Sequence, residues 1–224
     1  MKLTDEQIAK LKKLAEKQKE TKVFKTPANF LLLSPHPDDE SIGCGGFLCK
    51  YGKNTDVIIL TDGALGFSGT CPDNLVEIRQ NEVKAAMEVL KPRSFSFLNL
   101  PDLGLMFHEK EFDSIDLTKY DYVLIPNANE HHPDHATTFS FVKNLREKQN
   151  ANCILVEYEV WTPIIRPNLY LDITDVADTK WKAIEKYVSQ TEQFAYVDMA
   201  KGINRYRGGY KKTGYIEAYH VVEE

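Results

Sequence analysis

Apolar residues recur along the chain in short runs that are separated by longer amphipathic stretches. The continuous runs lie at residues 30–33, 57–60, 95–98, 122–125 and 154–160, with a weaker one at 169–173. Runs that are continuous rather than alternating are typical of strands buried on both faces, as in a parallel sheet. Helical periodicity lies between or after them, at about residues 41–51, 74–90, 135–149 and 176–189. The alternation of strands and helices predicts right-handed βαβ units in an open α/β sheet.

The first part of the chain has a different pattern. Residues 3–20 predict a charged amphipathic helix with Leu3, Ile8, Leu11 and Leu14 roughly along one side. Its apolar face is short and lacks aromatic residues, which favours packing against the domain or a second subunit over a membrane-surface role. We therefore expect a helical extension over residues 1–25, a single domain over residues 26–224, and the possibility of a homo-oligomer.

Composition and charge narrow the classes of partner. The 224 residues carry a net charge of −5, which argues against a broad nucleic-acid-binding surface. No segment approaches the roughly 20 apolar residues that cross a bilayer, and residues 1–20 lack the apolar core of a signal peptide. The four cysteines form no CxxC pair, so we interpret them as reduced thiols. These features predict a cytoplasmic protein without an integral membrane segment or a nucleic-acid partner.

Two clusters of candidate ligands each follow an apolar run. SPHPDDE (residues 34–40) follows the first run, and HHPDH (residues 131–135) follows the fourth. In a doubly wound, Rossmann-like sheet with helices on both faces, ligands bind beyond the carboxyl ends of the strands where the strand order reverses. If the first three strands run 3-2-1 and the fourth starts the other half, the two clusters converge on one crevice.

The residue types in these clusters indicate a metal. Imidazole together with carboxylate suits zinc or ferrous iron, whereas calcium and magnesium prefer all-oxygen shells. Two histidines and one carboxylate leave positions open for water and substrate, as in a catalytic site. An additional carboxylate beside the ligands is a candidate general base for the water. The alternative interpretation makes these residues loop caps and surface charges.

Three segments together resemble the PIG-L/LmbE-like zinc-dependent de-N-acetylases. They are HPDDE at residues 36–40, Arg79-Gln80-Asn81-Glu82 on the helix after the second strand, and HPDH at residues 132–135. That family includes N-acetylglucosaminyl-phosphatidylinositol deacetylases and the deacetylases of the mycothiol, bacillithiol and diacetylchitobiose pathways. The resemblance runs from about residue 30 to the end and includes residues 182–190 and 214–219.

The resemblance implies a role for each matched residue. It implies that His36, Asp39 and His135 are the metal ligands and that the metal is Zn²⁺. Fe²⁺ or another divalent transition metal also suits such ligands. Asp38 would be the general base. His132 would stabilise the oxyanion or protonate the leaving amine, with Asp134 hydrogen-bonded nearby to tune it, and Arg79 would grip sugar hydroxyls. Glu40 and Glu82 match no catalytic role and are expected to make supporting hydrogen bonds.

The function that follows is hydrolysis of an N-acetyl group from a small-molecule amino sugar, an N-acetylglucosaminyl conjugate, which releases acetate and a free amine. A non-haem Fe(II) oxygenase with a two-histidine-one-carboxylate site is an alternative, and so is a non-catalytic relative that binds sugar or metal. Residues 62–73, 101–119 and 191–214 are long connections, hence candidate binding loops. Within the last of these, the basic segment 201–212 is either a mobile loop over the crevice or a solvated loop. Trp161 follows the fifth strand, where it could stack on a sugar or belong to the core.

Overall fold

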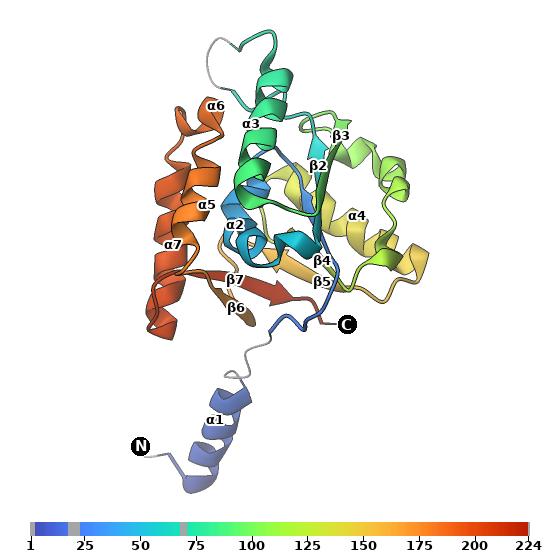
Figure 1. Cartoon of the computed structure of the whole chain (residues 1–224). Coiled ribbons are helices and arrows are strands. Elements are labelled where there is room, and N and C mark those ends of the chain that lie inside the picture. Colours follow the sequence, from blue (N-terminus) through green and yellow to red (C-terminus); the bar gives the residue numbers. More distant parts are fainter. Residues whose placement is uncertain (1–2, 18–22, 68–70, 224) are drawn as a thin grey trace.

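The computed structural model describes residues 3–17, 23–67 and 71–223, and its main body is a layered α/β structure (Figure 1). Seven strands form one sheet in the order β3-β2-β1-β4-β5-β7-β6. The strands are β1 (Phe30–Ser34), β2 (Thr55–Thr61), β3 (Ser94–Leu100), β4 (Tyr122–Pro126), β5 (Ile154–Tyr158), β6 (Leu169–Asp172) and β7 (Ile216–Val221). Strands β1 to β5 are parallel, and β7 is antiparallel to both β5 and β6. The predicted open, mostly parallel α/β sheet is therefore confirmed, and the 3-2-1-4 order assumed for its first four strands is the observed one.

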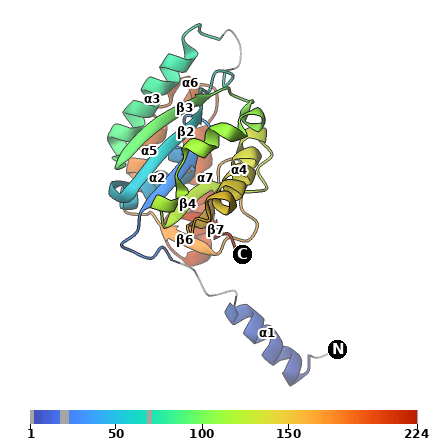
Figure 2. The same ribbon diagram turned by 90° about the vertical axis from the view of Figure 1, so that its right-hand side faces the viewer.

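Helices cover both faces of the sheet, as the two views show (Figures 1 and 2). The helices are α1 (Asp5–Lys17), α2 (Asp39–Tyr51), α3 (Leu75–Leu90), α4 (Pro133–Gln149), α5 (Ala177–Ile184), α6 (Val188–Thr191) and α7 (Tyr196–Lys211). Helix α4 covers one face together with short 3₁₀ turns between residues 105 and 119, whereas α2, α3, α5 and α7 gather on the other.

Strand β1 shows why the central strands have continuous apolar sequences. Phe30 and Leu32 point to the core beneath α2 and α3, while Leu31 and Leu33 point to the core beneath α4. All four side chains are fully buried. Because side chains alternate between the two faces of a strand, a strand covered on both sides must be apolar at every position.

Helix α2 packs very closely on the sheet behind the first cluster. A Cβ atom at Gly43 would overlap the Tyr158 side chain, and one at Gly46 would overlap Ile173. The glycines after SPHPDDE therefore allow close helix–sheet packing, which positions the start of α2 directly at the end of β1.

The segment between residues 191 and 214 differs from the predicted loop. Most of it is helix α7, so the basic segment 201–212 is largely helical rather than a mobile loop. The buried side of this helix is not purely apolar, since it includes the polar residues Asn204 and Arg207. Asn204 accepts a hydrogen bond from Lys180, and Arg207 forms an ion pair with Glu159. This helix is therefore held partly by polar contacts with distant segments, and it lacks the apolar periodicity from which a helix is predicted.

The N-terminal segment carries the predicted helix as α1. Residues 3–10 are exposed, including Leu3 and Ile8, so this part of the helix does not pack on the sheet. Residues 18–20 of the predicted helix and 68–70 of the predicted loop lie outside the described residues. Packing against a second subunit and the division at residue 25 stay predictions. Among the described helices, none is long and apolar enough to cross a membrane.

Candidate metal centre and catalytic pocket

The two clusters meet because β1 and β4 are parallel neighbours. Helix α2 begins at Asp39, five residues after β1 ends, and α4 begins at Pro133 after a short loop from β4. This arrangement brings His36 Nδ1 within 3.2 Å of His135 Nε2, across 99 residues of sequence. The convergence predicted from topology is confirmed.

Three of the predicted side chains direct their ligand atoms at a common point. Asp39 Oδ2 lies 3.2 Å from His36 Nδ1 and 3.0 Å from His135 Nε2, and the two histidine nitrogens are 3.2 Å apart. Ligands held at 2.0–2.1 Å by one tetrahedral ion are about 3.3 Å apart. The spacing of the three atoms therefore fits a single first-row divalent ion. A ring nitrogen of His132 also lies within 4.8 Å of those of His36 and His135.

A second layer of carboxylates holds His36 from its other side. Its Nε2 atom is 3.2 Å from Asp134 Oδ2 and 3.2 Å from Asp102 Oδ1. A metal-binding histidine commonly donates its free ring N–H to a carboxylate, which orients the ring and makes it a stronger ligand. The carboxylates of Asp134 and Asp102 are placed to accept this hydrogen bond from His36 Nε2.

This layer differs from the sequence-based expectation in two ways. The Asp134 carboxylate bonds to His36 and not to His132; only the backbone N–H of Asp134 donates to His132 Nδ1, at 3.3 Å. Asp102 was not predicted at all. It lies two residues after β3, and the available signal was its place in the predicted binding loop over residues 101–119, just past a strand end.

Asp38 is adjacent to the proposed ligands and has an unusual backbone. Its φ of 140° is a conformation that residues with side chains rarely adopt, and such strain is concentrated at functional sites. Its carboxylate forms a buried ion pair with Arg79 Nη2 at 2.9 Å. Burial raises the pKa of Asp38 well above its ordinary value, and the charge of Asp39 adds to this, although Arg79 and His36 oppose it.

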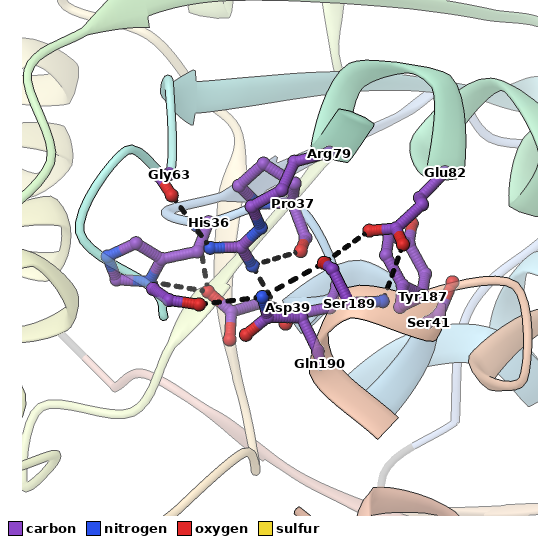
Figure 3. Close-up of polar contacts among 12 residues, drawn as sticks. His36, Pro37, Asp39, Ser41, Gly63, Arg79, Glu82, Tyr187, Ser189 and Gln190 are labelled. Carbon is purple, nitrogen blue, oxygen red and sulfur yellow. Dashed lines mark hydrogen bonds and ion pairs between the residues drawn. The ribbon is translucent and has the colours of Figure 1, made fainter. Parts of the chain in front are cut away.

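Arg79 lines the pocket, but most of the hydrogen bonds of its guanidinium group are made to other residues of the protein. Nη2 donates to Pro37 O at 2.6 Å as well as to Asp38, and Nη1 donates to Gly63 O at 3.2 Å (Figure 3). The residue as a whole is only 2% exposed. These contacts make Arg79 a partner of Asp38, and its predicted grip on sugar hydroxyls stays a prediction.

The site has an excess of buried negative charge. Among its described residues, the buried acids are Asp38, Asp39, Glu40 and Asp134, with Asp102 nearly so, while Arg79 is the one permanent cation. Burial alone lowers the pKa of His36, but hydrogen bonds to Asp102, Asp134 and Asp39 outweigh burial and raise it well above its ordinary value. Burial opposes ionisation of Asp39 too, yet the charge of His135 and hydrogen bonds from both histidines lower its pKa. The donor set thus fits a bound cation.

His132 has the opposite electrostatic character. Burial and the neighbouring His36 and His135 lower the pKa of His132 to about 4, which leaves the ring neutral at pH 7. Because the backbone N–H of Asp134 donates to Nδ1, the hydrogen of the neutral ring belongs on Nε2. His132 can therefore donate one hydrogen bond from Nε2.

Six of the residues described above line a cavity of about 130 Å³: His36, Asp38, Asp39, Arg79, Asp102 and His132. The remaining walls come from the loops after β2, β3 and β5, from α6 and from the start of α7, with Leu65, Gly66, Leu103, Trp161, Gln190 and Tyr196. Trp161 lines this cavity and packs edge-on against Tyr196, and its stacking on a sugar stays a prediction. Tyr196, like Asp102, was not predicted.

The two glutamates that matched no catalytic role make hydrogen bonds that support the site. Glu40 accepts from the Asp38 backbone N–H and from the Ser41 hydroxyl, and Glu82 accepts both the N–H and the hydroxyl of Ser189. His131, the remaining histidine of the second cluster, is exposed and contacts the Thr162 hydroxyl.

Comparisons with known proteins identify the class to which this fold and site belong. Residues 31–145, more than half of the chain, match the family model PIG-L, described as GlcNAc-PI de-N-acetylase. The chain belongs to the PIG-L family. The sequence resemblance stated above is thereby confirmed.

Individual relatives agree with this assignment. The diacetylchitobiose deacetylase of Thermococcus kodakarensis is 27% identical over 193 residues, which cover 75% of this chain and 72% of the relative. The N,N'-diacetylchitobiose deacetylase of Pyrococcus horikoshii, solved with its inhibitor MPG, superposes with a TM-score of 0.76 at 25% identity, covering 99% of this chain and 94% of the other. The conserved protein TT1542 of Thermus thermophilus gives a TM-score of 0.72 at 26% identity, covering 88% of this chain and 95% of the other.

Proposed function

We propose that this protein is a metal-dependent hydrolase that removes the N-acetyl group from an N-acetylglucosaminyl conjugate and releases acetate and a free amine. Membership of the PIG-L family and the deacetylase names of the relatives support the reaction class. The observation that carries the proposal is the convergence of His36, Asp39 and His135 beside a spare buried carboxylate, Asp38. A hydrolytic metal site needs both parts: three protein ligands and a base.

His36 Nδ1, Asp39 Oδ2 and His135 Nε2 would hold the ion, and Zn²⁺ is the ion that we propose. A zinc ion held in this way lowers the pKa of a bound water from 15.7 to about 7 and polarises a carbonyl oxygen. Asp134 and Asp102 would fix the His36 ring so that Nδ1 faces the ion. The excess of buried acid in the site provides the negative potential that binds a divalent cation.

Asp38 is the proposed general base. Its carboxylate takes the proton of the attacking water and later gives it to the nitrogen of the leaving amine. A carboxylate whose pKa is raised by burial is suited to both steps, because it holds the proton better than an exposed aspartate does. Arg79 keeps the carboxylate oriented through the 2.9 Å ion pair.

His132 is the proposed donor to the developing oxyanion. The ring is neutral at pH 7 and carries its hydrogen on Nε2, so it can stabilise negative charge on the acetamide oxygen by a hydrogen bond. A neutral imidazole is a poor source of a full proton, which assigns proton delivery to Asp38 instead. The oxyanion role is thus favoured over protonation of the amine.

The test is release of free amine from a panel of N-acetylglucosaminides that differ only at the anomeric carbon, with free N-acetylglucosamine included. Metal-stripped protein is assayed with and without added Zn²⁺, and bound metal is measured by mass spectrometry. We expect amine release that depends on zinc and does not require oxygen or a 2-oxo acid. Turnover that required both oxygen and a 2-oxo acid would instead identify the ferrous oxygenase alternative. Zinc binding without amine release from any substrate would refute the proposal for this class of sugar.

A further inference from the structure

The backbone of Asp38 is strained, and two separate anchors hold it. Arg79 binds the carboxylate and also Pro37 O, the carbonyl directly before Asp38 (Figure 3). Glu40 binds from the other side, because its Oε2 accepts the Asp38 N–H at 3.2 Å. A strained backbone persists only where its surroundings hold it, so these contacts determine where the carboxylate points.

Glu40 is itself held by a residue far away in the sequence. The hydroxyl of Tyr187, 147 residues later, donates a hydrogen bond to Glu40 Oε1, and the Ser41 hydroxyl donates to the same oxygen at 2.7 Å. Both Glu40 and Tyr187 are fully buried. Neither lines the catalytic cavity, so neither is placed to touch a substrate.

The position of Tyr187 depends on the break between helices α5 and α6. Tyr187 lies between them, and the following α6 is tied to α3 by Glu82, whose carboxylate accepts the Ser189 N–H at 2.7 Å and its hydroxyl at 2.8 Å (Figure 3). Arg79 lies on the same helix as Glu82, one turn earlier. Helix α3 therefore supports both anchors of Asp38, one directly and one through Tyr187.

We infer that Glu40 and Tyr187 are positioning residues for the reaction: the Tyr187 hydroxyl fixes the Glu40 carboxylate, which holds the Asp38 backbone in the conformation that directs its side chain into the pocket beside the proposed metal ligands. This inference rests on the proposed role of Asp38 as the base. It assigns a function to the turn between α5 and α6, which contributes no ligand to the proposed metal site.

The experiment compares Tyr187→Phe with Tyr219→Phe. The Tyr219 hydroxyl also donates to a buried glutamate, Glu217 at 2.7 Å, and Glu217 in turn accepts backbone N–H groups of α2. Tyr219 is fully buried too, so each variant loses a buried hydrogen bond from a tyrosine to a glutamate. The bond lost in Tyr187→Phe supports Asp38 through Glu40, whereas the bond lost in Tyr219→Phe does not. In Tyr187→Phe we expect kcat on the best sugar of the panel to fall about tenfold to a hundredfold, because a small misplacement of a catalytic group is costly. KM and zinc content should not change, and Tyr219→Phe should keep the kcat of the parent protein.

A second measurement does not depend on activity. Hydrogen–deuterium exchange of the peptide that contains residues 34–41 should be faster in Tyr187→Phe than in the parent protein or in Tyr219→Phe, because the Asp38 N–H loses a fixed acceptor. Faster exchange without detectable deacetylation in the parent protein would leave the anchor in place and refute only the proposed function. Equal exchange and equal kcat in Tyr187→Phe and its parent would overturn the inference.

If Tyr187→Phe does not fold, Ser41→Ala serves as the second variant. It removes the other hydroxyl donor to Glu40 Oε1 and leaves no large cavity. We expect a smaller fall in kcat at constant KM and faster exchange of the same peptide. Parent-like values for both measurements would again overturn the inference.

Discussion

Replacing Asp134 with asparagine tests whether the second layer of carboxylates controls the metal site. The two carboxylate oxygens receive three donors: Oδ2 accepts from His36 Nε2 at 3.2 Å and Leu103 N at 2.8 Å, and Oδ1 accepts from Leu105 N at 3.2 Å. Asparagine has one acceptor oxygen and one amide donor. Whichever way the amide is turned, its NH₂ group faces at least one of these donors.

The size of the expected loss in stability and in zinc affinity follows from the number of donors that lose their acceptor. If the oxygen keeps His36 and Leu103, the buried N–H of Leu105 is left without an acceptor, which costs about 1–3 kcal/mol of folding free energy. The His36 ring also loses the carboxylate charge that makes Nδ1 a stronger ligand. Loss of such an outer partner lowers metal affinity about 10- to 100-fold, or about 1.4–2.8 kcal/mol.

The assay is competition for Zn²⁺ against a chromophoric chelator, with the free energy of unfolding measured by denaturant in parallel. Asp62→Asn is the matched control, because Asp62 accepts the N–H groups of Ala64 and Asp102 on the same oxygen, a role that the amide oxygen of asparagine can fill. No described contact joins the Asp62 carboxylate directly to His36. We expect its zinc affinity to equal that of the parent protein. Asp134→Asn with parent-like zinc affinity would refute the assignment of Asp134 to His36.

Three further outcomes are expected. Asp38→Asn should lower kcat about 10²- to 10⁴-fold while zinc content stays the same, because it removes the proposed base and no ligand; parent-like turnover would remove Asp38 from that role. Gly66→Ala should lower kcat/KM about tenfold or more in the same assay, since its Cβ would overlap the Arg79 guanidinium and weaken the ion pair with Asp38; an unchanged value would show that Arg79 can shift without consequence. Asp56, whose pKa is lowered to about 2 chiefly by hydrogen bonds from Arg93, has a folded pKa below its ordinary 3.8. The contribution of the ionised Asp56 to folding stability is therefore complete above about pH 4 and is lost as the pH falls through about 2. Because the ion pair with Arg93 is partly exposed, Asp56→Asn should cost only up to about 1 kcal/mol at pH 7 and clearly less near pH 2, as urea titrations at both pH values would check.

Helix α7 shows one limit of prediction from sequence. Its buried side includes Asn204 and Arg207, and its segment contains Gly202, Gly208 and Gly209, which weaken any helical pattern. The helix is stabilised by partners from elsewhere, including Lys180 on α5 and Glu159 after β5. Periodicity detects a helix that buries apolar residues and is blind to one that buries paired polar residues.

The order of the central strands and the segments that form the site could be predicted from the chain alone. Continuous apolar runs identify strands buried on both faces, and parallel connectivity brings residues 36–39 and 132–135 to the same edge. Those features are local patterns combined with general rules of topology. They do not require knowledge of any one side-chain conformation.

The pairing of side chains within the site, in contrast, emerged from the folded molecule. Asp134 turns to His36 instead of His132, Asp102 joins it from another loop, and Arg79 pairs with Asp38. Each of these contacts depends on distances and rotamers set by the packing of helices and loops from distant parts of the chain. A hydrogen bond, including one within an ion pair, forms only when donor and acceptor lie about 3 Å apart, so its partners are defined only when the whole fold has placed them.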